Sequence, residues 1–410
     1  MAKSKNISNM VGCVDCCGCK LCGDVCPQKC ISFKLDDEGF SIPLINEDSC
    51  TNCGLCSKLC PEINQTFHPE APCAISAYSK NNEVHKEGSS GGIFGTLALH
   101  VIAQGGKVYG AAFDEMFQLK HVGIETTHEL LPLCKSKYLQ SDCANVYKQV
   151  KCDLKEGRKV LFCGTPCQCQ ALSNYVGKNQ DNLVVVDFAC HGVSCQPLFD
   201  ENIARYGRKI GSVESYKFRE KKTARYHQTF NIQYVRNANH HQSFILDTKG
   251  KDGRAASWIG TYYKDPYYYG YEKRFTLRKS CYSCKWASSK RCSDLTMSDF
   301  FGLAELNPSI KEKYVSCIFC NTEKGRNLFI AVKEKLSGVG TYAVADAARN
   351  NECLRNPMKK PSHRDQFFAD WKQYGFDAVV EKYLTPKHIW IYDIYYAIPS
   401  TIRKLIRKYI

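Results

Sequence analysis

The sequence predicts a mixed α/β (α+β) protein: a small cysteine-rich N-terminal domain, an α/β body with an antiparallel section, and a helical C-terminal tail. Of its 410 residues 26 are cysteine, and eleven of these fall within the first sixty positions. Beyond about residue 72, apolar segments with strand and helix patterns alternate. The predicted domains are residues 1–70, 71–345 (an N-terminal part 71–155 and a C-terminal part 156–345) and 346–410.

The elements of the body are expected from their periodicity. Ile93 to Ala103 is an apolar, helix-like stretch, and the segment KVYGAAF that follows it is strand-like. A short strand over Lys159–Phe162 leads into a Gly/Pro turn and a helical stretch. Asn182–Phe188 is almost continuously apolar, as in a sheet covered on both faces. From about residue 213 to 247, the segments YKFRE, QTFNIQYVR and HHQSFILDT alternate like antiparallel strands.

The cysteines are expected to be metal ligands rather than disulfides. Disulfide-dense domains are small secreted modules, whereas this chain is long enough for two or three ordinary domains. The start MAKSKNISNM has no apolar signal region, and no run of about eighteen apolar residues predicts a spanning helix. We therefore expect a reduced, cytoplasmic protein. The formal charge of +15 suits an acidic redox partner or a membrane surface, and no nucleic-acid-binding motif accompanies it.

One motif, C-x2-C-x2-C-x3-C followed by proline, occurs twice near the N-terminus. Its cysteines are Cys16, Cys19, Cys22 and Cys26 in the first copy and Cys50, Cys53, Cys56 and Cys60 in the second. A 4Fe-4S cubane needs four thiolates around one centre, and the fourth cysteine of each run ligates the other cluster. We therefore expect Cys26 to complete the cluster of the second copy and Cys60 that of the first. The spacing favours iron-sulfur over zinc, whose sites use more widely separated cysteine pairs.

The region from about residue 10 to 65 resembles bacterial two-cluster 4Fe-4S ferredoxins. Cys13, Cys17 and Cys30 are surplus to this pattern. Cys13 offers an alternative register with Cys16 and Cys19, but only the register that ends at Cys26 matches the second copy.

Several segments of the body carry a second resemblance. Gly88–Gly92 (GSSGG) precedes a helix, where backbone amides can approach a phosphate or flavin, although a plain turn also explains it. CGTPCQCQAL and DFACHGV place cysteines after two parallel strands. KSCYSCKWASSKRCSDLTMSDFFG contains another cysteine pair. Together with KYLQSD (Lys137–Asp142) and FRE-K (Phe218–Lys221), these segments resemble the beta-subunit family of coenzyme F-420 hydrogenases and dehydrogenases over about residues 72–340.

This second resemblance implies a flavin (FAD or FMN) and a third 4Fe-4S cluster. The residues that it places at the flavin are Ser89, Ser90, Gly91, Gly92, Lys137, Gln140, Ser141 and Gly164. The ligands that it places at the third cluster are Cys167, Cys190, Cys281 and Cys284. Cys163 or Cys292 could replace one of these ligands, and Asp294 is not excluded. Ser298 and Phe301 depart from the glycine and tryptophan that are usual in the family.

The remaining motifs have plainer interpretations. Cys317 and Cys320 lie in an apolar strand-like run, where core filling is favoured over a zinc site shared with the pair at 281 and 284. His191 is either an active-site group or a hydrogen-bonded turn residue. The tyrosine-rich stretch Thr261–Phe275 is explained by packing more readily than by stacking on a ligand. The basic amphipathic segment 402–409 predicts a helix that either contacts a membrane surface or docks on its own core. The cysteines expected to be inert thiols are Cys73, Cys134, Cys143, Cys152, Cys169, Cys195 and Cys353.

These features predict a flavin-dependent iron-sulfur oxidoreductase. It would pass electrons between the dicluster and a small organic substrate or a deazaflavin cofactor through the flavin. The dicluster would carry electrons to or from a redox protein partner. Bacterial relatives of this kind are often found with surface-polysaccharide synthesis machinery, which makes such a setting a further expectation. The alternative is a non-catalytic iron-sulfur electron-transfer subunit or a redox-sensing module. No catalytic acid or base for a substrate can be named from the residues.

Overall fold

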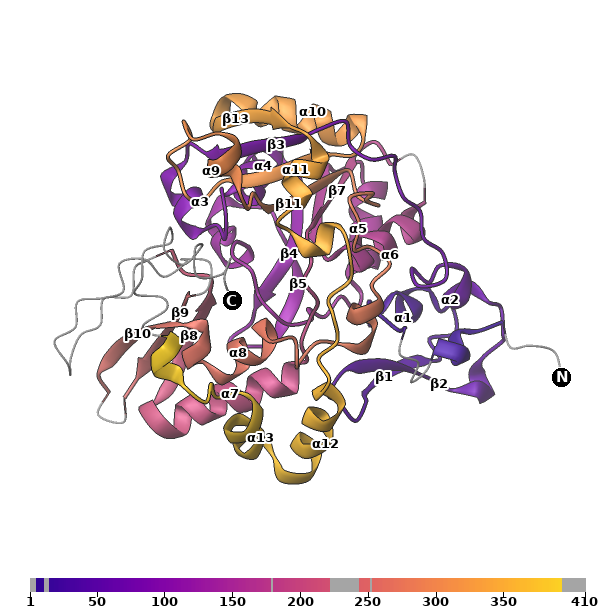
Figure 1. The fold of residues 1–410 in the computed structure, drawn as a ribbon. Coiled ribbons are helices and arrows are strands. Elements are labelled where there is room, and N and C mark those ends of the chain that lie inside the picture. Colours follow the sequence, from indigo (N-terminus) through magenta and orange to yellow (C-terminus); the bar gives the residue numbers. More distant parts are fainter. Residues whose placement is uncertain (1–4, 11–14, 178–179, 222–242, 251–252, 393–410) are drawn as a thin grey trace. The chain divides into compact units, whose positions relative to one another are not determined.

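The computed structural model describes residues 5–10, 15–177, 180–221, 243–250 and 253–392 (Figure 1). Its elements confirm the predicted mixed α/β class. The chain divides into two compact units, one within residues 1–134, 140–193 and 278–359 and the other within 135–139, 194–277 and 360–410. The division at residues 70 and 345 follows the linear sequence and stays a prediction.

An eight-stranded mixed sheet forms the centre of the first unit, in the order β13-β3-β12-β11-β7-β6-β4-β5. Strands β4, β6, β7 and β11 pair in parallel, and antiparallel pairs continue the sheet on both sides. The strands are β3 (Ala74–Ser79), β4 (Lys107–Phe113), β5 (Leu119–Ile124), β6 (Val160–Gly164), β7 (Leu183–Phe188), β11 (Leu295–Asp299), β12 (Ser316–Cys320) and β13 (Leu336–Tyr342). The strands expected at KVYGAAF, Lys159–Phe162 and Asn182–Phe188 are all present.

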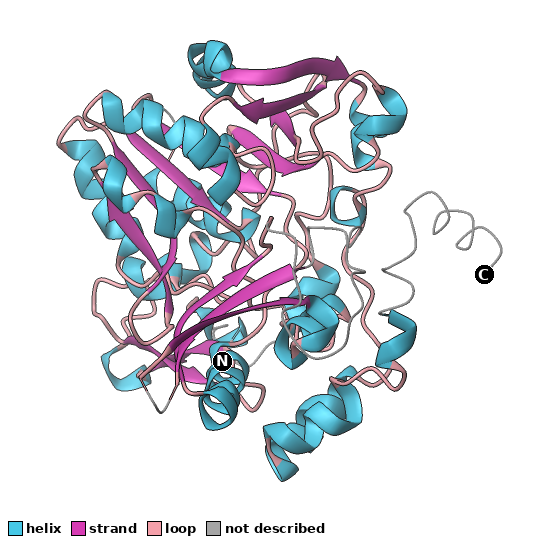
Figure 2. Ribbon diagram, turned by 90° about the vertical axis from the view of Figure 1, so that its left-hand side faces the viewer, coloured by secondary structure: helices cyan, strands magenta, loops and turns pink. Residues whose placement is uncertain are grey.

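Helices cover both faces of this sheet, as the apolar character of β7 predicts (Figure 2). On one face, α4 and α10 pack over Val108, Leu161 and Val186. On the other face, α5 and α6 pack over residues such as Phe162 and Val185. Beyond the N-terminal segment, the described helices of this unit are α3 (Asn82–Glu87), α4 (Ile93–Ala103), α5 (Val146–Lys155), α6 (Pro166–Val176), α9 (Leu303–Leu306), α10 (Glu323–Val332) and α11 (Val344–Ala348).

The cysteine-rich N-terminal segment contains two short helices, α1 (Leu21–Val25) and α2 (Leu55–Lys58), and the antiparallel hairpin of β1 (Ile31–Leu35) and β2 (Ser41–Ile45). Its buried side chains join those of α5 and α6 in one hydrophobic cluster. The segment therefore shares its core with the sheet-forming body of the first unit.

The second unit contains the predicted antiparallel section as a three-stranded sheet of β8 (Ser212–Phe218), β9 (Ser243–Lys249) and β10 (Ala255–Thr261). Its helices are α7 (Gln196–Ile210), α8 (Pro266–Glu272), α12 (Arg364–Tyr374) and α13 (Phe376–Tyr383). Asp265 caps α8 through the amide of Tyr268, and the tyrosines of this segment are buried, which agrees with packing as their role. The predicted strand QTFNIQYVR and helix 402–409 lie outside the described residues. No helix among those described is long and apolar enough to cross a membrane.

A buried ion pair supports the packing between β7 and the segment before β11. The Arg291 guanidinium lies 3.2 Å from a carboxylate oxygen of Asp187, and both side chains are almost wholly buried. Arg291→Met leaves that carboxylate buried without its cation, so we expect the free energy of unfolding to fall by about 3–5 kcal/mol. Chemical denaturation of the anaerobically isolated protein measures this loss.

A matched control is Arg326→Met, which changes an exposed arginine of α10 and should cost less than about 0.5 kcal/mol. The double variant Arg291→Met with Asp187→Leu should recover much of the lost stability, because neither buried charge remains. A single-variant loss no larger than that of the control would contradict the assignment.

Candidate iron-sulfur sites and their surroundings

The two cysteine loops of the N-terminal segment have matching backbones. Gly18 and Lys20 in the first loop have φ of 65°, and Asn52 and Gly54 at the equivalent places in the second have φ of 52° and 76°. These left-handed residues turn the chain tightly ahead of α1 and α2, so that successive cysteines point inward. The sequence duplication is therefore also a duplication of local structure.

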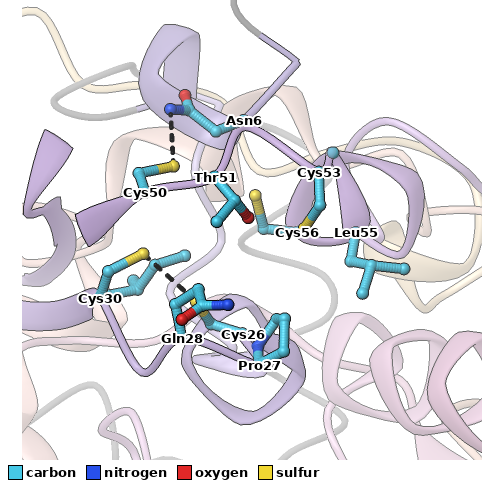
Figure 3. A pocket seen from close by; sticks show the side chains of 12 residues that line it. Asn6, Cys26, Pro27, Gln28, Cys30, Cys50, Thr51, Cys53, Leu55 and Cys56 are labelled. Atoms are coloured by element: carbon cyan, nitrogen blue, oxygen red, sulfur yellow. Dashed lines mark hydrogen bonds between the residues drawn. The ribbon is translucent and has the colours of Figure 1, made fainter. Parts of the chain in front are cut away.

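The second loop lines a pocket together with the end of the first motif (Figure 3). Its walls include Cys50, Cys53 and Cys56, and from the first motif Cys26. The empty space at this pocket, open solvent included, is about 320 Å³. We refer to Cys26, Cys50, Cys53 and Cys56 as the second set. Four soft thiols around a compact hollow fit a 4Fe-4S cluster.

Two further polar side chains contact the sulfurs of the second set. The Asn6 amide nitrogen lies 3.5 Å from Cys50 Sγ, and Cys30 Sγ lies 3.3 Å from Cys26 Sγ (Figure 3). Cys30 also lines the pocket, so a fifth thiol stands at this site. The sequence interpretation left Cys30 without a role and did not consider Asn6. Groups that donate to cluster sulfurs tune the electronic properties of the metal.

The cysteines Cys16, Cys19, Cys22 and Cys60, here called the first set, also lie close to one another. Burial raises the pKa of the Cys22 thiol, and the nearby thiols of Cys16 and Cys60 add to that shift. Burial likewise raises the pKa of Cys60 to about 11. Crowded, buried thiols do not readily lose their protons unless a cation lies among them. A bound metal cluster supplies that positive charge and so favours the thiolate form.

Four cysteines from three distant stretches of the body converge in the same way. Cys167 lies in the first turn of α6, Cys190 follows β7, and Cys281 and Cys284 lie in and after a 3₁₀ helix (Lys279–Ser283). Burial raises the pKa of Cys190, and the other three thiols add to the shift. We call this group the third set. The structure thus brings together the four cysteines that the family resemblance implied.

Two of the three alternative ligands, Asp294 and Cys292, have hydrogen-bond partners within the protein. The Asp294 carboxylate accepts hydrogen bonds from the Val185 amide at 2.8 Å and from the Thr322 hydroxyl at 2.7 Å. Cys292 is buried with its sulfur 3.4 Å from the Pro166 carbonyl oxygen. Cys163 lies within β6, and its place as an alternative ligand stays a prediction. In the described part of the chain, no three His, Cys, Asp or Glu side chains are placed to hold a single metal ion.

Cys17 connects the first and third sets. Its thiol lies beside that of Cys167, which belongs to the third set, and beside that of Cys19 in the first. Glu62 lies beside Cys17, and burial raises the pKa of this carboxyl to about 7, opposed by the positive charge of Lys285. Cys17 had no role in the sequence interpretation, since its position between two cysteine sets follows from packing alone.

The residues implied at the flavin come from separate segments of the chain, in both units. In the GSSGG turn, the Ser90 hydroxyl donates to the Val315 carbonyl at 3.1 Å, and the Gly91 amide donates to Ser316 Oγ at 2.9 Å. Gly92 has φ of 76° and caps α4. A Cβ at Gly91 would come within 2.5 Å of the Ala77 carbonyl, so this glycine is required by packing. Ser89 is half-buried in the same turn.

The other implied flavin residues also have protein partners. Ser141 Oγ lies 2.8 Å from His121 Nδ1 and accepts from the Gln168 amide at 3.0 Å; Gly164 ends β6 next to this network. The Gln140 amide donates to the Cys17 carbonyl at 2.6 Å. In the second unit, Lys137 Nζ donates to the Lys135 carbonyl at 3.3 Å. Their roles at a flavin stay predictions.

The remaining candidates are placed as follows. Cys317 is fully buried in one core cluster, while Cys320, three residues along β12, packs against the cluster on the opposite face. This arrangement agrees with core filling. His191 Nε2 lies 3.6 Å from the buried Cys353 sulfur, which also contacts Asn351 Oδ1 at 3.0 Å. Both interpretations of His191 therefore stay open.

Comparisons with known proteins agree with this picture. Residues 15–63 match the model of the 4Fe-4S dicluster domain. Residues 157–339 match the model of the C terminus of the coenzyme F420 hydrogenase/dehydrogenase beta subunit. No curated protein matches the chain. Among solved structures, a chain of the F420-reducing NiFe hydrogenase complex from Methanosarcina barkeri matches with 15% identity and a TM-score of 0.41, covering 77% of this chain and 93% of that chain.

The dicluster match and the paired cysteine loops define an iron-sulfur electron-transfer protein. More specifically, residues 15–63 are similar to 4Fe-4S dicluster domains and residues 157–339 to the C terminus of coenzyme F420 hydrogenase/dehydrogenase beta subunits, which relates the chain to iron-sulfur electron-transfer oxidoreductases. Both resemblances found in the sequence are confirmed.

Proposed function

We propose that this protein carries electrons along three 4Fe-4S clusters to a flavin, which exchanges them with a small organic substrate or a deazaflavin. The observation that carries the proposal is the convergence of the third set, together with the thiol contact from Cys17 to Cys167. Electron transfer between cofactors needs closely spaced sites, and this contact links the dicluster loop directly to the body.

Each of the three sets would hold one cluster. The second set lies beside Asn6, and the third set lies within the sheet-forming body. When bound, such clusters pass single electrons, and a flavin converts them into a two-electron transfer. In the chain itself, three cysteines of the first set (Cys19, Cys22 and Cys60) are buried, and the four cysteines of the third set are half-buried. Asn6 and Cys30 would adjust the sulfurs of the second set through hydrogen bonds.

A second candidate is a non-catalytic electron-transfer subunit or redox-sensing module without flavin. It is favoured by the protein partners of Ser90, Gln140 and Ser141, whose polar atoms the fold already uses. The proposal includes a role in surface-polysaccharide synthesis as the physiological setting. It also includes contact with a redox partner or with a membrane. The family name alone supplies the deazaflavin as a candidate substrate.

Anaerobic purification with iron, sulfide and flavin measured on the same sample tests the proposal. We expect about twelve irons and one flavin per chain. About eight irons would remove the third cluster, and zinc in place of iron would overturn the scheme. Twelve irons without flavin, also after incubation with FAD or FMN, would select the non-catalytic alternative.

A further inference from the structure

Arg278 places a permanent positive charge in the interior beside two of the cysteine sets. Its side chain is 4% exposed, and it stands three positions before Cys281 of the third set. The guanidinium Nε donates to the carbonyl oxygen of Cys16, a member of the first set, at 2.6 Å. Its Nη1 donates to Gln140 Oε1 at 2.9 Å, and its Nη2 donates to the Ser41 carbonyl at 3.0 Å.

All three acceptors are neutral. Within the described residues, no carboxylate forms an ion pair with Arg278, whereas the neighbouring cations Lys20 and Lys279 pair with Asp142 and Glu38 at 2.7 and 2.9 Å. A guanidinium does not lose its proton in proteins, and a buried charge is costly unless an opposite charge compensates it. The partner of Arg278 must therefore come from negative groups that form when the site is loaded.

The nearby thiols provide that negative charge once they bind iron. The Cys281 amide donates to the Arg278 carbonyl at 3.0 Å, and the Arg278 side chain reaches the Cys16 carbonyl, so Arg278 is joined directly to a cysteine of the third set and to one of the first. An oxidised cubane with four thiolates carries a net charge of roughly −2, and reduction adds one more negative charge. A cation fixed in a low-dielectric interior stabilises the reduced form relative to the oxidised form.

The packing holds this cation in one place. Gly18 in the first cysteine loop has φ of 65°, and a Cβ there would lie 2.6 Å from Nη1. The guanidinium carbon lies 5.2 Å from the centre of the Phe40 ring, and Gln140 bridges Arg278 to the Cys17 carbonyl. Arg278 thus fixes the first cysteine loop to the segment that supplies the third set.

We propose that Arg278 is the counter-cation of the clusters at the first and third sets and raises their reduction potentials while it positions the first cysteine loop. This rests on the proposed function, in which these cysteines hold clusters. Arg278 acts through the loop and through its charge, so it is a positioning residue rather than a catalytic one.

Anaerobic redox titration followed by electron paramagnetic resonance tests this proposal on the full chain. In Arg278→Gln we expect the ratio of reduced to oxidised cluster, at a fixed potential, to fall at least tenfold for one or more clusters. This corresponds to about 59 mV for a one-electron couple. Arg278→Lys keeps the charge and should restore most of the ratio.

The matched control is Lys279→Gln, which removes the same charge from the adjacent residue. The Lys279 side chain is 43% exposed and paired with Glu38, so solvent screens it, and the ratio should change less than threefold. Equal shifts in the two variants, or no shift in Arg278→Gln at full iron content, would overturn the proposal.

Iron counted in every sample separates this inference from the proposed function. A wild-type protein without clusters would refute the function, whereas a complete iron content with unchanged potentials refutes only the role of Arg278. If Arg278→Gln does not take up iron, Gln140→Glu gives a second test, because it leaves Arg278 in place and adds a carboxylate next to Nη1. An unchanged ratio in that variant would equally count against Arg278.

Discussion

Cys281→Ala is expected to lower the iron content from about twelve to about eight atoms per chain. Cys281 lies with Cys167, Cys190 and Cys284 in the third set, and a cubane with three thiolates and no replacement ligand is lost or loses iron. The dicluster signals in electron paramagnetic resonance should remain, because the first and second sets are unchanged. Iron analysis and spectra of the anaerobically purified variant measure both effects.

Cys292→Ala is the matched control for that variant. Cys292 is a buried thiol close to Cys167 and was an alternative ligand on the sequence alone, yet its sulfur contacts the Pro166 carbonyl. We expect this variant to keep all its iron. Iron loss in Cys292→Ala with full retention in Cys281→Ala would reverse the ligand assignment.

Cys60→Ala is expected to abolish the cluster of the first set although Cys60 belongs to the second motif. Cys60 lies with Cys16, Cys19 and Cys22, whereas the second loop is completed by Cys26. About four irons should be lost, and the remaining dicluster signal should be that of the second set. In the electron paramagnetic resonance spectrum of this variant, the magnetic interaction between two neighbouring clusters should be absent, which would identify a protein that holds only the second-set cluster of the dicluster.

The same variant should also destabilise the first unit. Cys19, Cys22 and Cys60 are part of the buried cluster that continues into α5 and α6, so an empty site leaves a hollow in that core. Metal binding at such a site contributes directly to folding. A lower denaturant midpoint than for Cys169→Ala, a buried thiol of the same core, is the expected outcome. If Cys60→Ala instead removes the second-set signal, the crossed ligation is wrong.

The fold could largely be predicted because its strands are short apolar runs in a sheet covered on both faces. The helix at Ile93–Ala103 and the strand β7 follow directly from such patterns. The association of the N-terminal segment with α5 and α6 could not be predicted in this way. This association depends on which apolar faces pack together. A periodic pattern identifies the apolar face of a helix or strand, but it does not identify the element against which that face packs.

The flavin residues show where a motif is ambiguous. The GSSGG turn has the small residues that a ligand site needs, but Gly91 and Ser90 are also required by contacts with the start of β12. From the sequence, Gln140 could equally have contacted a ligand. In the structure, its side-chain nitrogen donates to the Cys17 carbonyl and its side-chain oxygen accepts from Arg278. A sequence pattern indicates that only certain residues fit at a position. It does not indicate whether a ligand or another part of the protein imposes that restriction.

The sequence by itself determined the likeness to a dicluster domain, because all eight predicted ligands lie in two short loops whose spacing is set by local backbone geometry. It also determined the mixed α/β class, through the periods of its apolar residues. Only the tertiary structure decided which scattered thiols meet in the third set, that Cys17 touches Cys167, and that Arg278 lies buried against the first loop. The contacts of Cys17 with Cys167 and of Arg278 with Cys16 join residues more than a hundred positions apart, and their proximity depends on the packing of the sheet and its helices.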